Sequence, residues 1–144
     1  SPEHSLDQSE TELAINNVQQ FIDRYPQSYL IDSCNQIIDQ LQFKLETKQY
    51  DQVKLYDRME NYKAAVAAGE MFLEGHGQSD FAEEINYVVV KNSYFLTINS
   101  IESKKSERFE QTNERFRTFV LRHPQSKYSK ELSSYLDKLS ENNN

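Results

Sequence analysis

Apolar residues recur at intervals of three and four positions along most of this chain, which is the spacing of one face of an α-helix. Helices are predicted at about 8–24, 28–59, 61–75, 79–102, 106–122 and 126–140. The segment 28–59 contains neither Gly nor Pro, and its pattern leaves two interpretations open: one long helix, or two helices with a break near 47–49. The β-branched triplet 88–90 would suit a strand, but the surrounding helical period outweighs it.

One phrase recurs three times where the helical pattern is interrupted: FIDRYPQS at 21–28, FLEGHGQS at 72–79 and FVLRHPQS at 119–126. The flanks of the three copies match as well. Helix-pair repeats typically show such a period with helical patterning between the copies. The sequence therefore predicts an all-α fold of about six helices, in which antiparallel, tetratricopeptide-like (TPR-like) helix pairs form a short α-solenoid within one domain, residues 1–144.

Each copy of the phrase contains residues that end one helix and begin the next. Pro26 and Pro124 lack a backbone N–H and clash with the preceding turn. Gly77 takes their place in the middle copy and suits the left-handed conformation that often ends a helix. A serine closes every copy and is predicted to cap the following helix by accepting its free N–H groups. These serines are Ser28, Ser79 and Ser126.

The aromatic positions of the phrase predict how each helix end packs. The phenylalanine that opens every copy is expected to fill the last turn of its helix against a neighbouring helix. His76 and His123 occupy the position of Tyr25. We therefore interpret the two histidines as helix-end residues, in preference to metal ligands or bases. The three phenylalanines are Phe21, Phe72 and Phe119.

Charge and cysteine content narrow the class of partner. The net charge is −7, but residues 1–90 carry 16 acids against 6 bases, whereas residues 91–130 carry 4 acids against 9 bases. An acidic chain with one basic segment favours a protein partner over nucleic acid, although a merely solvated basic face is the simpler alternative. Cys34 is the only cysteine, so an internal disulfide is impossible, and its place in an apolar series predicts a buried thiol.

The sequence offers little catalytic or ligand-binding chemistry. The three His and the one Cys lack metal-site spacing, and neither a P-loop, a GxGxxG nor a GxSxG motif occurs. The acidic pair Glu83 and Glu84 is adjacent, so its members point to different sides of a helix and are poorly placed for acid–base catalysis. We therefore expect that the protein is not an enzyme, and we expect no cofactor, metal or catalytic residue.

Two stretches are candidates for protein binding. In KLYDRMENYKAA (54–65), three large side chains stand beside small alanines, and packing within a helix pair is the alternative interpretation. In the stretch 99–116, bases crowd a predicted helix–helix connection and could pair with carboxylates of a partner. The candidate partner-binding residues are Tyr56, Met59, Tyr62, Lys104, Lys105 and Arg108.

With the repeats identified, the sequence resembles the BamD-like outer membrane assembly lipoproteins of Gram-negative bacteria. The resemblance rests on AINNVQQFIDRYPQSYLIDSCNQIIDQLQFKLETKQYDQVKLYDRMENYKAAVAAGEMFLEGHGQS and on its continuation through INYVVVKNSYFLTINSIESKKSERFEQTNERFRTFVLRHPQSKYSKEL. The style of the sequence, including SLDQSETELAI, is most similar to Bacteroidetes members. The resemblance covers nearly the whole chain. It matches only the carboxyl-terminal part of such proteins, whose lipidated cysteine and first repeats would lie upstream.

The resemblance implies a role that the residues alone do not show. It implies a scaffold subunit of the β-barrel assembly machinery, lipid-anchored at the periplasmic face of the outer membrane. Its implied partners are the POTRA domains of a BamA-like barrel subunit and other subunits of the machinery, with no nucleic acid and no membrane contact except the lipid anchor. The alternative is another periplasmic TPR adaptor that binds peptides or cell-envelope and division proteins.

Overall fold

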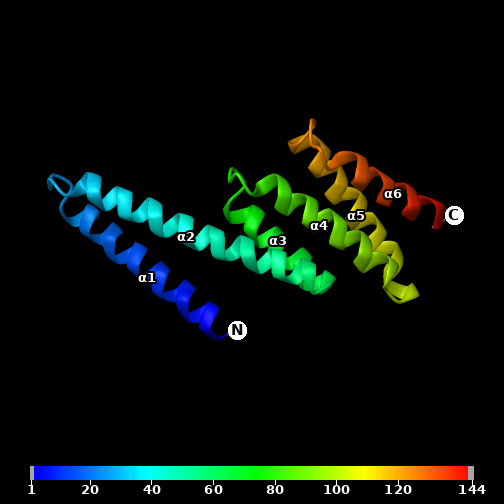
Figure 1. Cartoon of the computed structure of the whole chain (residues 1–144), viewed down its shortest axis with the longest axis horizontal. Helices are drawn as coiled ribbons and strands as arrows, with labels where there is room; N and C mark the ends of the chain where they lie inside the picture. The colour runs from blue at the N-terminus through cyan, green and yellow to red at the C-terminus, as the bar shows by residue number, and fades with distance from the viewer. Residues whose placement is uncertain (1, 143–144) are drawn as a thin grey trace. The chain divides into compact units, whose positions relative to one another are not determined.

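The computed structural model describes residues 2–142, and the prediction of an all-α fold is confirmed: six helices and no strand are present in that range (Figure 1). The helices are α1 (Pro2–Arg24), α2 (Ile31–Arg58), α3 (Tyr62–Gly75), α4 (Ala82–Ile98), α5 (Glu102–Arg122) and α6 (Ser129–Asn142). The chain divides into two compact units, 1–48 and 49–144, which we call unit 1 and unit 2.

The helix bounds differ from the predicted ones in a regular way. After each copy of the phrase, the next helix begins at Ile31, Ala82 or Ser129, three residues later than predicted. The fourth helix ends at Ile98 and the fifth begins at Glu102, so the predicted connection near 103–105 lies instead at 99–101. Residues 31–58 form one continuous helix, so the first of the two interpretations of segment 28–59 is correct and no break occurs near 47–49.

The three copies of the phrase form one corner with the same backbone hydrogen bonds. In the third copy, the N–H of His123 donates to the carbonyl of Phe119 (2.8 Å), and the N–H of Ser126 donates to the carbonyl of His123 (3.1 Å). The Ser126 Oγ accepts from the N–H of Tyr128 at 3.1 Å. The corners at 21–31 and 72–82 repeat all three bonds.

This geometry explains the late helix starts. The prediction that each serine caps the next helix is wrong. The N–H that it binds belongs to the residue two positions on, which directly precedes the first helical residue, and the N-cap of α4 is Phe81, which has no side-chain cap. Such a serine turn occupies backbone that would otherwise begin the helix. The connection between two helices therefore extends beyond the end of the repeated phrase, and the next helix begins later than the phrase suggested.

Two of the three corner phenylalanines pack against neighbouring helices as the sequence predicted. Phe72 and Phe119 are fully buried, and each contacts the ring four residues on: His76 at 5.1 Å and His123 at 5.4 Å between centroids. Phe21 makes the same contact with Tyr25 at 5.1 Å. The similar tilt of the three ring pairs, 46–50°, supports the interpretation of both histidines as helix-end residues.

The prediction for Gly77 is wrong. Within residues 2–142, no glycine has a positive φ angle. A Cβ on Gly77 would lie 3.2 Å from the carbonyl oxygen of Leu73, so close approach to the backbone is what favours glycine there.

The left-handed residue of the structure is Glu60, with φ of 56°. The N–H of Asn61 donates to the Tyr56 carbonyl and that of Glu60 to the Asp57 carbonyl, which is the Schellman pattern of a helix end. Asn61 then caps α3 by accepting from the N–H of Ala64 at 3.3 Å. Two adjacent residues thus end α2 and begin α3.

Helix α4 forms the centre of unit 2. Its Val88 and Val89 belong to one apolar cluster with α3 and residue Val53, whereas Val90 and Tyr94 belong to a second cluster with α5 and α6. Because α4 is covered on opposite sides, its apolar residues lie all around it, as expected for a central helix. The helix α3 approaches α4 closely at Gly69, where a Cβ would lie only 2.4 Å from Val89 Cγ2.

A tyrosine contact repeats between the helices of unit 2. Tyr50 stacks on Phe81 at 4.2 Å and donates its hydroxyl to Glu84 Oε1 at 2.6 Å. In the same way, Tyr87 stacks on Tyr128 at 4.2 Å and donates to Glu131. The aromatic partner in both cases is the residue just before a helix begins, and the glutamate follows it by three positions. We call each of these contacts a tyrosine clasp.

Unit 1 consists of α1, the corner at 25–30 and the first part of α2. It buries few side chains: Ile38 is buried, but Tyr29, Leu30, Ile37 and Phe43 are exposed. Cys34 is half-buried and free, so the predicted burial of its thiol is only partly correct.

Candidate functional site

Three of the predicted binding residues lie where α2 ends and α3 begins. Tyr62, the first residue of α3, stacks on Phe95 near the end of α4, with 5.5 Å between ring centroids. Tyr56 is half-buried and its hydroxyl accepts from Gln52, whereas Met59 is 62% exposed. The structure thus places the first candidate stretch at the same end of unit 2 as the end of α4 (Figure 1).

The predicted basic residues lie in the first turns of α5, not in a loop. Lys104 is exposed, Lys105 is half-buried at 4.0 Å from Glu102, and Arg108 donates to Ser100 Oγ at 2.6 Å. Because α5 begins just after the end of α4, these bases lie at the same end of unit 2 as Tyr62. We call this region the α3–α4 end, defined by Tyr56, Met59, Tyr62, Ile98, Ile101, Lys104, Lys105 and Arg108.

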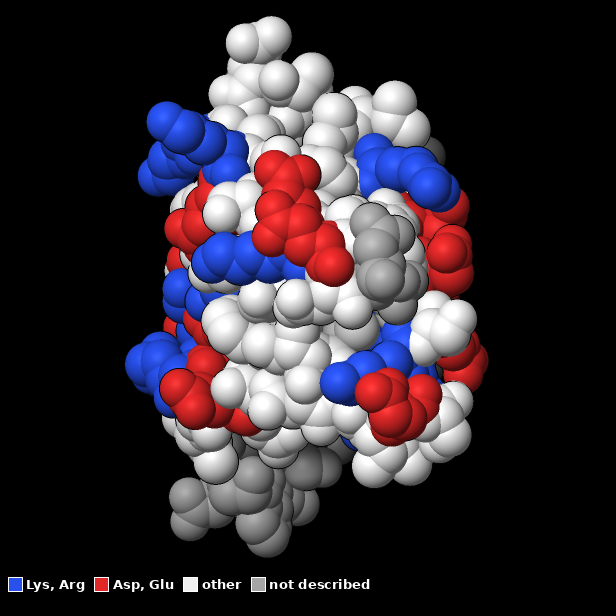
Figure 2. Space-filling model, turned by 90° about the vertical axis from the view of Figure 1, so that its right-hand side faces the viewer, with Lys and Arg blue, Asp and Glu red and all other residues white. Residues whose placement is uncertain are grey.

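The basic segment 91–130 does not form a uniform basic surface. Lys91 pairs with Asp57 at 3.0 Å, Arg115 pairs with Glu70 at 2.6 Å, and Arg117 pairs with Glu114. On the face drawn in Figure 2, basic and acidic side chains lie next to one another. The tertiary structure therefore neutralises much of the charge that is concentrated in the sequence.

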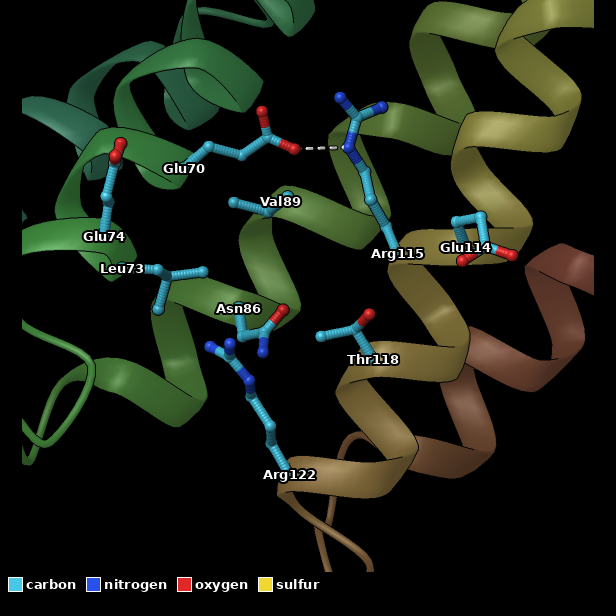
Figure 3. Close-up of a pocket in the computed structure, with 9 residues that line it drawn as sticks. All are labelled: Glu70, Leu73, Glu74, Asn86, Val89, Glu114, Arg115, Thr118 and Arg122. Atoms are coloured by element: carbon cyan, nitrogen blue, oxygen red, sulfur yellow. Dashed lines mark hydrogen bonds and ion pairs between the residues drawn. The ribbon is translucent and has the colours of Figure 1, made fainter.

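A groove runs between α3 and α5 with α4 as its floor (Figure 3). Its volume is about 360 Å³. A second hollow of about 570 Å³ shares four of its residues and extends it to Gly77 and His123. The wall from α3 carries Glu70 and Glu74, and the wall from α5 carries Arg115 and Arg122, so the two walls have opposite charge. The full lining is Glu70, Leu73, Glu74, Asn86, Val89, Glu114, Arg115, Thr118 and Arg122.

Arg115 is held in place by a buried polar network. Its guanidinium donates to Glu70 Oε1 at 2.6 Å and to Ser93 Oγ at 3.0 Å. Ser93 in turn lies 2.7 Å from the hydroxyl of Thr112, which also contacts Thr97 at 3.1 Å. Hydroxyls buried between α4 and α5 thus form hydrogen bonds with each other and fix the Arg115 side chain.

The floor of the groove carries Asn86, which is only 4% exposed. No hydrogen-bond partner for its side-chain amide exists among residues 2–142. In Figure 3 the amide faces the space between the walls, on the side of Thr118 and Arg122. The amide keeps some contact with solvent, since Thr47 Oγ1 is the fully buried side-chain atom without a partner in the described range. It can therefore donate to and accept from a ligand in the groove.

Comparison with known protein families decides the identity of the scaffold. The model of the family described as "YfiO: Outer membrane lipoprotein" matches residues 43–142. The chain belongs to this family. A comparison with curated proteins found no match.

The YfiO match supports the resemblance stated from the sequence as far as a BamD-like outer membrane lipoprotein. It includes all of the described part of unit 2, and with it both the α3–α4 end and the groove. In this YfiO-family chain, none of the helices within residues 2–142 is both long and apolar enough to cross a membrane. The same residues contain no grouping of three or more His, Cys, Asp or Glu that could hold a metal ion.

The six candidate binding residues of this YfiO-family chain all fall in the α3–α4 end, whereas the sequence did not predict the groove. The charged wall residues are spread over α3 and α5, and each resembles an ordinary exposed helix residue when read alone. A polar residue within an apolar helix segment was the available signal, since Asn86 lies between Ile85 and Tyr87. This position in the sequence indicates that the Asn86 side chain is buried, but it does not indicate which surface the amide faces.

Proposed function

We propose that this chain is the carboxyl-terminal helical-repeat part of a BamD-like lipoprotein, a non-enzymatic scaffold of the β-barrel assembly machinery. It docks on POTRA domains of a BamA-like barrel subunit at the periplasmic face of the outer membrane and supports folding and insertion of outer membrane proteins. A lipid anchor upstream of this chain holds the protein to the membrane. The observation that carries the proposal is the family match over residues 43–142.

The α3–α4 end has the composition of a docking surface. Ile101 and Met59 are 67% and 62% exposed, and Ile98 is 38% exposed, so apolar side chains are available there for burial. Exposed Lys104 adds a charge at the rim, where it would steer a partner more than hold it. In such an interface a few buried apolar residues supply most of the binding free energy.

The test is the affinity of the intact lipoprotein for the isolated POTRA domains of its barrel subunit, measured by calorimetry or surface-bound kinetics. We expect Ile101→Asp to weaken binding by about tenfold or more, since it removes an apolar contact and places a charge in the interface. We expect Lys104→Glu to slow association and to reduce its dependence on salt.

Leu121→Asp is the matched control, because Leu121 is 82% exposed and lies at the opposite end of α5. This variant should bind with unchanged affinity. Failure of the unmodified lipoprotein to bind POTRA domains would overturn the proposed function. Equal loss in Ile101→Asp and Leu121→Asp would show that the α3–α4 end is not the docking surface.

A further inference from the structure

The groove between α3 and α5 contains a polar group that the fold itself does not use. Asn86 is nearly fully buried, yet its amide faces the groove without a hydrogen-bond partner among residues 2–142 (Figure 3). An asparagine amide both donates and accepts, and therefore matches the N–H and C=O of a peptide bond. Solvent still reaches this amide, because the fully buried side-chain atom without a partner in the described range is Thr47 Oγ1. A ligand with a peptide backbone would replace that solvent by direct hydrogen bonds.

The walls of the groove indicate the side chains of such a ligand. Arg122 on α5 and Glu74 on α3 form no ion pair with any residue in the described range, and both line the groove. Arg115 and Glu70 pair with each other across the groove and close it on one side. Glu114 also lines the groove, but it pairs with Arg117 of its own helix. One free cation and one free anion thus remain on opposite walls.

We propose that this groove binds an extended segment of a partner protein in which an acidic residue directly neighbours a basic one. The backbone of the segment pairs with the Asn86 amide on the floor. Neighbouring side chains of an extended chain point to opposite sides, so the carboxylate reaches Arg122 on one wall while the cation reaches Glu74 on the other. A helix would not present adjacent residues in this way.

The inference goes beyond docking at the α3–α4 end, because the groove lies on a different surface and needs a different ligand. The ion pairs at its walls are partly exposed and change the affinity by only about 1.4- to 5-fold each, so they select a sequence more than they bind it. The Asn86 pairing is the better shielded contact and distinguishes a backbone from a side chain. Binding of one short segment is therefore weak, and a longer partner would add contacts along the extension toward His123.

The experiment titrates the full chain, labelled with ¹⁵N, with an acetylated and amidated peptide that contains adjacent Glu and Lys between alanines. We expect saturable shifts of the Asn86 side-chain amide and of the Arg122 Nε resonance. A peptide with two Gln in place of Glu and Lys should bind about 2- to 30-fold more weakly, as loss of two exposed ion pairs predicts. A peptide with two adjacent Glu should gain nothing over the Gln peptide, since its second carboxylate faces Glu74.

Variants test the assigned contacts. Arg122→Gln should weaken binding of the Glu-Lys peptide by about 2- to 5-fold and leave the Gln peptide unaffected. Lys104→Gln is the control on the same helix, because Lys104 is exposed and outside the groove lining, and it should bind normally. Asn86→Leu should abolish the backbone contact and weaken both peptides by about 5-fold.

Absence of shifts at Asn86 at the highest soluble peptide concentration would overturn the proposal. So would equal affinity of the Glu-Lys and Gln peptides together with equal effects of Arg122→Gln and Lys104→Gln. Thermal unfolding of each variant separates lost binding from lost folding. In the intact lipoprotein, Arg122→Gln should retain POTRA binding, so failure of the groove and failure of the proposed function give different results.

Discussion

The hydroxyl of Tyr50 lies 2.6 Å from a carboxylate oxygen of Glu84, and this hydrogen bond joins the end of α2 to the first turn of α4. Lys54 binds the other oxygen of the same carboxylate at 2.6 Å. Burial alone would raise the pKa of Glu84, but the hydrogen bonds from Lys54 and Tyr50 outweigh it and lower that pKa. Tyr87 and Glu131 repeat the tyrosine–carboxylate contact between α4 and α6.

We predict that Tyr50 makes the fold sensitive to alkali. Burial and the hydrogen bond to Glu84 raise its pKa from 10.0 to about 12. The folded state therefore holds the proton more tightly than the unfolded state, so this contribution to stability is complete below pH 10 and is lost as the pH rises through about 12. Tyr50→Phe should lower stability at neutral pH by about 1–2 kcal/mol and flatten its decline above pH 10.

Urea unfolding of both proteins at a series of pH values measures this effect. Tyr29→Phe is the control, because Tyr29 is 92% exposed. An unchanged alkaline slope in Tyr50→Phe would contradict the assigned role of the clasp.

A methyl group at Gly69 should destabilise the protein although alanine is the better helix former. Its Cβ would lie 2.4 Å from Val89 Cγ2, deep between α3 and α4. Overpacking of this kind typically costs about 1–3 kcal/mol, which exceeds the gain of up to about 1 kcal/mol in helix propensity. Gly75→Ala is the matched control, since a Cβ there would meet nothing within 4 Å. Chemical denaturation should show a loss for Gly69→Ala and no loss for Gly75→Ala; the reverse order would rule out close approach at Gly69.

Glu60→Gly should stabilise the protein. Glu60 holds a φ of 56° at the end of α2, a conformation that costs a residue with a Cβ about 1–2 kcal/mol. Glycine avoids most of this strain and fits the left-handed position of the Schellman pattern. Thermal melting should therefore rise for Glu60→Gly and fall for Glu74→Gly, which places glycine in regular α3 helix. A lower melting temperature for Glu60→Gly would mean that the Glu60 side chain contributes more than its backbone strain costs.

Asn86→Leu should raise stability while it removes binding in the groove. The amide makes no hydrogen bond within the described residues, so a leucine of similar size gives up no internal hydrogen bond and adds buried apolar surface. We expect a gain of about 1 kcal/mol in the free energy of unfolding. Ser93→Ala is the contrasting variant, because the Ser93 hydroxyl contacts both Thr112 and Arg115, and its removal should destabilise. A loss of stability in Asn86→Leu would show that the fold needs this amide.

The sequence by itself determined the helices, the corners and the packing of the corner aromatics. These features depend on interactions within a few residues: the ring of Pro26, the hydroxyl of Ser126 and the contact of Phe119 with His123 all act on their own turn of chain. Local chemistry repeated in the sequence therefore produces local geometry repeated in the structure. The errors were local too, since the serine turn delays each helix by three residues and Gly77 avoids a carbonyl instead of adopting a left-handed conformation.

Only the tertiary structure decided which distant residues meet. The pairing of Arg115 with Glu70, the clasp of Tyr50 on Glu84 and the close approach at Gly69 each join separate helices, and nothing in the local pattern specifies such partners. The same holds for Asn86, whose polarity was visible in the sequence but whose direction was not. A helix period shows which residues share a face, whereas the neighbour of that face is set by packing of the whole unit, and that packing creates the groove.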